Sequence, residues 1–97
     1  MVPLTNTQVR DLKAQAQKLK AALTIGKEGL SPQFLVALDE VLKHHELVKV
    51  KFDEFKEQKK GLAPQLAEKS RSHLVTRVGN VVVLYRPKPV EEKQQEV

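Results

Sequence analysis

A chain of 97 residues is long enough for one domain with a modest hydrophobic core, and too short for two. It has no cysteine, which excludes disulfides and thiolate zinc sites, and no apolar run approaches the length of a membrane-spanning helix. Its net charge of +5 favours a polyanionic partner, above all nucleic acid. The N-terminus lacks a signal-peptide pattern, so we expect a cytoplasmic protein with no membrane partner.

The first predicted helix runs from Asn6 to about Ala22, with Thr5 or Asn6 as its N-cap. Apolar residues recur there at helical spacing, at Val9, Leu12, Ala16 and Leu19. Another face of the same segment is rich in lysine and glutamine. Most of the excess positive charge lies in this first third of the chain, because residues 1–30 carry five basic and two acidic side chains.

A short apolar run, 22–25, predicts a buried strand that leads into the loop Gly26-Lys27-Glu28-Gly29. Ser31 followed by Pro32 is a typical helix start, since serine caps the first amides and proline suits the first helical position. The second helix then carries an apolar stripe from Phe34 to Leu42 and ends near His44 and His45.

The second half of the chain predicts a strand, a helix and a hairpin. Residues 47–52 alternate between apolar and basic side chains, as a half-exposed strand does. A third helix is expected from around Pro64 to Arg71. Two strands, 73–78 and 81–85, flank Gly79-Asn80, a two-residue turn typical of hairpins. The second of these strands is apolar on both faces, which predicts an interior position.

The predicted order is therefore α-β-α-β-α-β-β, in one domain spanning residues 1–87, followed by a disordered tail at residues 88–97. This is an α/β arrangement of the α+β type.

The glycine-framed loop is the clearest candidate binding site. Glycines permit positive φ and let an anion approach the main chain, and the following helix N-terminus favours negative charge. Lys27 adds a cation within the loop, whereas Glu28 adds an unfavourable negative charge. Spacing alone leaves open an ordinary strand-to-helix turn without a ligand. Neither a mononucleotide P-loop nor a dinucleotide fingerprint matches the loop.

Catalysis is not expected. His44, His45 and Glu46 invite a metal-dependent hydrolase as an alternative, but adjacent helical residues point about 100° apart and do not naturally share one ion. We assign these histidines to the C-terminal end of the second helix, where the dipole suits them. The sequence therefore predicts no metal, no cofactor and no small-molecule substrate.

Three stretches together resemble the CRM-domain family (chloroplast RNA splicing and ribosome maturation), in its stand-alone, YhbY-like bacterial form. They are Ile25-Gly26-Lys27-Glu28-Gly29-Leu30, His44-His45-Glu46-Leu47-Val48-Lys49-Val50-Lys51 and Val78-Gly79-Asn80-Val81-Val82-Val83-Leu84-Tyr85-Arg86-Pro87. The resemblance spans about Thr5 to Pro87. It implies a four-stranded mixed sheet similar to the C-terminal domain of translation initiation factor three.

The resemblance also implies RNA binding, with ribosomal RNA of the large-subunit precursor as the partner. Carried over by position, Gly26, Lys27, Glu28 and Gly29 form the RNA-binding loop. Lys13 and Lys20 are the expected basic support from the first helix, and Lys49 and Arg86 extend it.

Two alternatives stay open at this point. The charge-balanced segment 53–60 and the polar tail would suit a protein-interaction module that docks on a ribosomal protein or assembly factor. A KH domain shares a Gly-x-x-Gly loop, but there the loop joins two helices, whereas a strand precedes it here.

Overall fold

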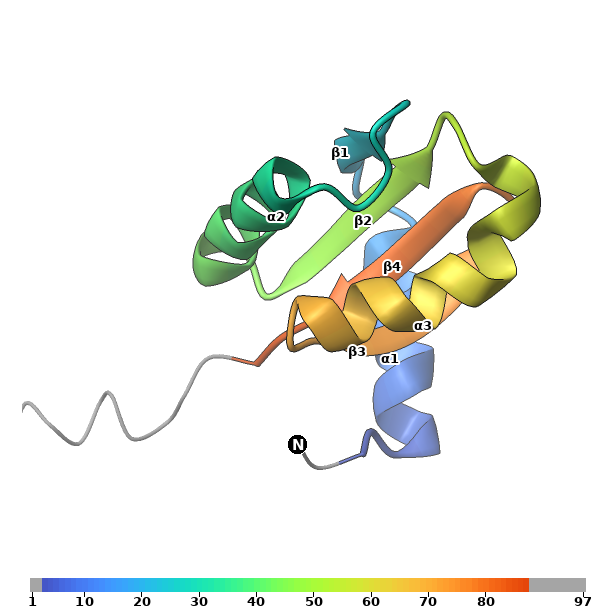
Figure 1. Cartoon of the computed structure of the whole chain (residues 1–97). Coiled ribbons are helices and arrows are strands. Elements are labelled where there is room, and N and C mark those ends of the chain that lie inside the picture. The colour runs from blue at the N-terminus through green and yellow to red at the C-terminus, as the bar shows by residue number, and fades with distance from the viewer. Residues whose placement is uncertain (1–2, 88–97) are drawn as a thin grey trace, which may run out of the picture.

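The computed structural model describes residues 3–87, in which three α-helices pack on one sheet of four strands (Figure 1). The predicted tail at residues 88–97 lies outside these residues. In chain order the elements are α1 (Asn6–Ala16), β1 (Ala21–Ile25), α2 (Pro32–His44), β2 (Leu47–Phe52), the 3-10 turn η1 (Lys56–Gln58), α3 (Lys59–Lys69), β3 (His73–Val78) and β4 (Val81–Tyr85).

The sheet has the strand order β1-β2-β4-β3. Strands β1 and β2 are parallel, whereas β4 pairs antiparallel with both β2 and β3. The parallel pair needs a crossover, which α2 provides. The predicted mixed sheet and element order are thus confirmed.

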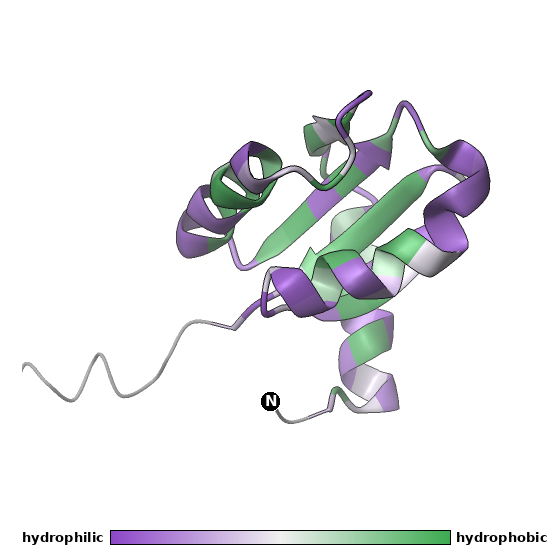
Figure 2. Ribbon diagram, in the orientation of Figure 1, coloured by the Kyte–Doolittle hydropathy of each residue, from purple (hydrophilic) through white to green (hydrophobic). Residues whose placement is uncertain are grey.

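Helices cover both faces of the sheet, as Figure 1 shows with α2 and α3 in front and α1 behind. The larger core lies between the sheet and the front helices, and it includes Ile25, Leu38, Val50, Phe52, Leu66 and Leu84. A smaller core lies under α1, where Leu12 and Ala16 pack near Val75 and Val83. In Figure 2 the hydrophobic colour runs along the central strands between these layers.

The two central strands meet different demands, and their sequences differ accordingly. In β2, Val48, Val50 and Phe52 face the larger core, while Lys49 and Lys51 alternate with them on the other face. In β4, the run Val82–Leu84 is buried throughout because layers cover both faces. The Gly79-Asn80 hairpin turn is also confirmed, with Gly79 at a φ of +58°.

The first helix is shorter than predicted. Thr5 caps it, and Gln8 completes a capping box with Thr5. The expected end near Ala22 is wrong, because α1 ends at Ala16 and the next amides make tight turns. The helical periodicity extends to Leu19, but pairing with β2 draws the chain into the sheet from Ala21 onward.

The third helix begins earlier than predicted and includes the proline that was expected to start it. It spans Lys59–Lys69, with Pro64 inside. Proline removes the amide that would bond to the carbonyl of Lys60, and both residues are exposed, so that carbonyl lies where water reaches it. Ala63 and Leu66 face the core instead.

Replacing Leu38 by alanine tests the larger core. Leu38 is fully buried in α2, so its truncation should lower the free energy of unfolding by about 2–5 kcal/mol in urea titrations followed by circular dichroism. Val36 lies on the same helix with 64% of its surface exposed, and Val36→Ala should change stability by no more than about 0.5 kcal/mol. Equal losses for both variants would contradict this assignment of the core.

Candidate nucleic-acid interface

The Gly26–Gly29 loop leaves the end of β1 as a closed turn. The amide of Gly29 donates to the carbonyl oxygen of Gly26 at 3.0 Å, and Gly29 has a φ of +64°. The residues that follow β2 fix the base of the loop, because the amides of Asp53 and Glu54 donate to the Ile25 carbonyl at 3.0 and 3.1 Å. The loop therefore keeps its position relative to the end of β2.

The two glycines serve different ends. A Cβ built on Gly26 meets nothing within 4 Å, and its φ is not in the left-handed region, so this position keeps an open approach to the main chain. A Cβ on Gly29 would lie 3.3 Å from the ring of Phe55, and its positive φ already disfavours a side chain. Gly29 is thus required by the fold, whereas Gly26 is free for a ligand.

The start of α2 supplies hydrogen-bond donors beside the loop. The hydroxyl of Ser31 accepts from the amide of Phe34 at 3.1 Å, as the sequence predicts for an N-cap. Pro32 has no amide proton, and the amide of Gln33 has no acceptor among the described residues. An anion beside the loop would meet this free donor and the positive end of the helix dipole.

Lys27 and Glu28 both lie exposed at the tip of the loop. Together with the glycines and Gln33 they line a shallow hollow of about 350 Å³. The structure brings the four predicted loop residues together, with cation and carboxylate on the same hollow.

A second basic surface lies on the α1 side of the sheet. Lys13 from α1 and Lys49 from β2 line one hollow of about 330 Å³, which is floored by Val78, Val81 and Val83. We call it the basic groove. The Lys49 ammonium also donates to the carbonyl of Leu19 at 3.0 Å, which keeps its charge near the turn after α1. Two residues predicted separately from the sequence are thus neighbours.

The basic groove and the loop occupy the same end of the sheet. In the parallel pair, Ile25 lies opposite Phe52, and in the antiparallel pair Lys51 lies opposite Val81. The end of β1, the end of β2 and the start of β4 therefore lie at the same end of the sheet.

Two of the predicted basic residues occupy other places than expected. Lys20 is not part of the first helix, because α1 ends four residues earlier; it lies exposed in the connection to β1. Arg86 follows β4, and Tyr85 pairs with Leu47, so Arg86 lies at the opposite end of the sheet from the loop.

Arg86 is held by protein partners. Its Nη2 donates to the Asp39 carboxylate at 2.7 Å and to the carbonyl of Ser70, which links α2 to the end of α3. The hydrogen bond from Arg86 lowers the pKa of Asp39 below its ordinary value, against a smaller opposing effect of burial. Arg86 therefore contributes to packing whatever else it contacts.

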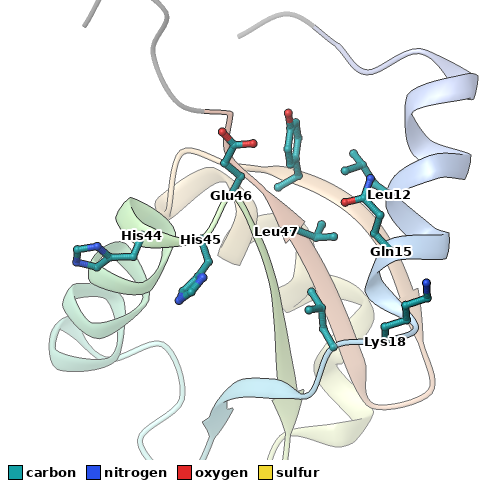
Figure 3. Close-up of a pocket in the computed structure, with 9 residues that line it drawn as sticks. Leu12, Gln15, Lys18, His44, His45, Glu46 and Leu47 are labelled. Atoms are coloured by element: carbon teal, nitrogen blue, oxygen red, sulfur yellow. The ribbon is translucent and has the colours of Figure 1, made fainter. Parts of the chain in front are cut away.

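His44 and His45 lie exposed at the C-terminal end of α2. Figure 3 shows His44 and His45 pointing in different directions, as their adjacent positions predict. They border a hollow of about 560 Å³, together with Glu46 and residues of α1. Within residues 3–87 there is no group of three or more metal-ligating side chains, and no helix long and apolar enough to cross a membrane.

With this geometry in view, comparison with known proteins is decisive for the family. Residues 4–86 match the CRS1/YhbY (CRM) domain. The chain belongs to this family. This CRM domain is 36% identical over 95 residues to the probable RNA-binding protein YqeI of Bacillus subtilis, covering 97% of the chain and 98% of YqeI.

Further relatives agree with that assignment. A probable RNA-binding protein of Pseudomonas aeruginosa is 33% identical over 91 residues, which cover 93% of this chain and 88% of the relative. The solution structure of a Staphylococcus aureus protein, described as a candidate RNA-binding protein, matches with a TM-score of 0.78 and 33% identity over 94% of this chain and 96% of that one. The family resemblance inferred from the sequence is confirmed.

One residue of the loop region escaped the sequence analysis of this CRM domain. Phe55 adopts a left-handed conformation, with a φ of 59°, and its ring packs against Gly29. The signal was a single aromatic within the charged segment 53–60, which is unusual for a fully solvated connection. The spacing of residues in the sequence did not predict the contact between the Phe55 ring and Gly29.

The Asp39–Arg86 pair predicts a pH dependence of stability. Because the pKa of Asp39 is lowered in the folded state, its contribution is present above the unfolded value near 4 and is lost as the pH falls through the folded pKa. Asp39→Asn should therefore destabilise this CRM domain at neutral pH and leave its stability almost unchanged at strongly acidic pH. Urea titrations across the pH range measure both.

Glu40→Gln is the matched control for this experiment, since it removes a neighbouring exposed carboxylate whose one ion-pair partner within residues 3–87 is Lys43. We expect a small effect, as is usual for exposed ion pairs. A loss from Asp39→Asn that persists undiminished at acidic pH would contradict the pKa argument.

Proposed function

We propose that this protein is a non-enzymatic RNA-binding protein that grips the phosphate backbone with the Gly26–Gly29 loop and the basic groove. The observation that carries the proposal is that the loop, with the free amide of Gln33 beside it, and the lysine-lined groove lie at the same end of the sheet. Its curated relatives in Bacillus and Pseudomonas are named as probable RNA-binding proteins, which agrees with it.

In this proposal the loop binds one phosphate. Gly26 leaves space for the phosphate oxygens, the amide of Gln33 donates a hydrogen bond, and Lys27 adds a mobile positive charge. Glu28 points the loop's single carboxylate toward the same hollow, so its repulsion weakens rather than helps phosphate binding. We assign Glu28 no contact with RNA that would favour binding.

The basic groove binds the neighbouring part of the strand. Lys13 and Lys49 supply charge at its rim. Lys51 lies exposed two residues after Lys49 in β2. The floor is made of valines and contains no aromatic ring for base stacking. Recognition in this arrangement depends on the backbone and shape of the RNA more than on its sequence. Lys20 adds charge from the connection before β1.

The RNA that we propose is ribosomal RNA of the large-subunit precursor, in the cytoplasm. This finer assignment is what the resemblance of the sequence to the stand-alone bacterial members of the family implies. A basic surface without sequence-reading side chains suits a structured RNA that presents its backbone in a fixed shape.

Replacing Gly26 by aspartate tests the loop. The new side chain has open space, so the fold should remain intact, while its negative charge should repel phosphate and weaken RNA binding by about tenfold or more. Filter binding or fluorescence anisotropy with ribosomal RNA fragments measures the affinity, and circular dichroism the fold. Position 26 is a better choice than position 29, where strain and the Phe55 ring would disturb the loop itself.

Gly61→Asp is the matched control. It introduces the same side chain at an exposed position of α3, where a Cβ also meets nothing within 4 Å. Unchanged affinity for both variants would remove the loop from the proposal.

Steep salt dependence of the wild-type RNA affinity is expected if contacts to phosphates dominate binding, and an affinity that does not change with salt would contradict backbone binding.

Crosslinking in cells, followed by sequencing of the attached RNA, tests the target. We expect ribosomal RNA of the large subunit, with loss of crosslinks in the Gly26→Asp variant. Association with ribosomal particles that survives both this substitution and ribonuclease treatment would favour the alternative of a protein-interaction module.

A further inference from the structure

A fourth hollow, of about 370 Å³, lies between α2 and the C-terminal end of α3, on the opposite face of the sheet from α1. We call it the α2–α3 hollow. Figure 1 shows both helices on the front of the sheet. Leu35, Val36 and Asp39 line it from α2, and Lys69, Ser70, Arg71 and Arg86 line it from the other side.

The charge of this hollow is positive and incompletely neutralised. Three cations line it, against one carboxylate, Asp39, which already accepts from Arg86 at 2.7 Å and lies 3.6 Å from Lys43. No carboxylate of residues 3–87 lies within 4.0 Å of the charged groups of Lys69 or Arg71. Two cations therefore face the hollow without a counter-ion.

Arg71 occupies a backbone position where its side chain is not needed for the fold. The amide of Ser72 donates to the carbonyl of Ala67 at 2.9 Å, and that of Arg71 to Glu68 at 3.2 Å, which is the pattern of a Schellman motif. Its left-handed residue, with a φ of 56°, is usually glycine because a Cβ is unfavourable there. The fold alone would accept glycine at least as well as arginine.

The guanidinium of Arg86 still has hydrogen-bonding capacity. Its Nη2 donates to Asp39 and to the carbonyl of Ser70, but its Nε is buried and has no acceptor among the described residues. A partly exposed guanidinium with an unmade hydrogen bond at its buried Nε is stabilised by additional negative charge nearby. An anion in the hollow supplies that charge beside all three cations.

We propose that the α2–α3 hollow binds a second phosphate of the RNA strand held by the Gly26–Gly29 loop, with Arg71 and Lys69 as its main contacts. This inference rests on the proposed RNA-binding function. Asp39, which contacts Arg86 in the hollow, lies eight residues after Ser31, which is about 12 Å along the axis of α2. One strand of a few nucleotides can thus follow α2 from the loop to the hollow.

RNA fits the hollow better than an acidic protein segment for a reason of position. Both ligands carry oxygen anions that match the guanidinium fork of Arg71. The hollow, however, shares α2 with the loop, so a phosphate chain that starts at the helix N-terminus reaches Lys69 and Arg71 without leaving this side of the molecule. Exposed Val36 offers an apolar surface for a ribose beside the phosphate.

Arg71→Gly is the decisive variant. Glycine relieves the left-handed backbone, so thermal unfolding should occur at the same or a higher temperature than in the wild-type chain. RNA affinity should nevertheless fall by about five- to tenfold. The slope of log affinity against log salt should decrease by about 0.7, the value for one single-strand phosphate contact. Lys69→Gln should also lower the RNA affinity and the slope of log affinity against log salt.

Arg10→Gln is the charge control, because it removes one exposed cation from α1 on the other face of the sheet. An equal effect of Arg10→Gln would show that net charge alone is responsible, and would overturn the site. Unchanged RNA affinity in both Arg71→Gly and Lys69→Gln would overturn the site as well. This holds also if the two variants lose binding to a protein partner while they keep their RNA affinity.

Gly26→Asp separates this inference from the function on which it rests. Loss of binding in Gly26→Asp with full binding in Arg71→Gly overturns the α2–α3 hollow and leaves the loop in place. If the wild-type chain binds no ribosomal RNA fragment, the proposed function and the second phosphate site fail together.

Discussion

The pairing of β2 with its two neighbours is the constraint on which the rest of the molecule depends. Antiparallel pairing with β4 builds a strand pair whose inner side chains form the larger core. Parallel pairing with β1 forces a helical crossover, and so delivers the loop and the start of α2 to one end of the sheet. The same register brings Lys49 under α1. Core packing and the position of the basic surfaces therefore follow from one set of strand contacts.

Much of this architecture is readable from local patterns. The alternation in 47–52, the apolar run in 81–85 and the Gly79-Asn80 turn each report a short-range requirement, and the strands appear as predicted. Ser31 and Pro32 mark the start of α2 for the same reason. The loop was also identified, because its glycines and the helix that follows are adjacent in the chain.

What the sequence did not predict depends on contacts between distant segments. The end of α1 is decided by the pairing of β1 with β2 and not by helical periodicity, which continues beyond Ala16. α3 begins before Pro64 with Ala63, Leu66 and Ala67 buried in the larger core, and local propensity does not report these contacts. The meeting of Lys13 with Lys49, and the ion pair that holds Arg86 at the other end of the sheet, join residues that are far apart in the chain.

The contact between Gly29 and the ring of Phe55 has a thermodynamic consequence for any ligand of the loop. The turn is closed by its own hydrogen bond, backed by an aromatic ring and fastened to the end of β2 through the Ile25 carbonyl. Its backbone entropy is therefore lost when the protein folds and not when a ligand arrives. Pre-organisation of this kind lets a few short polar contacts produce useful affinity, because none of them must also order the loop.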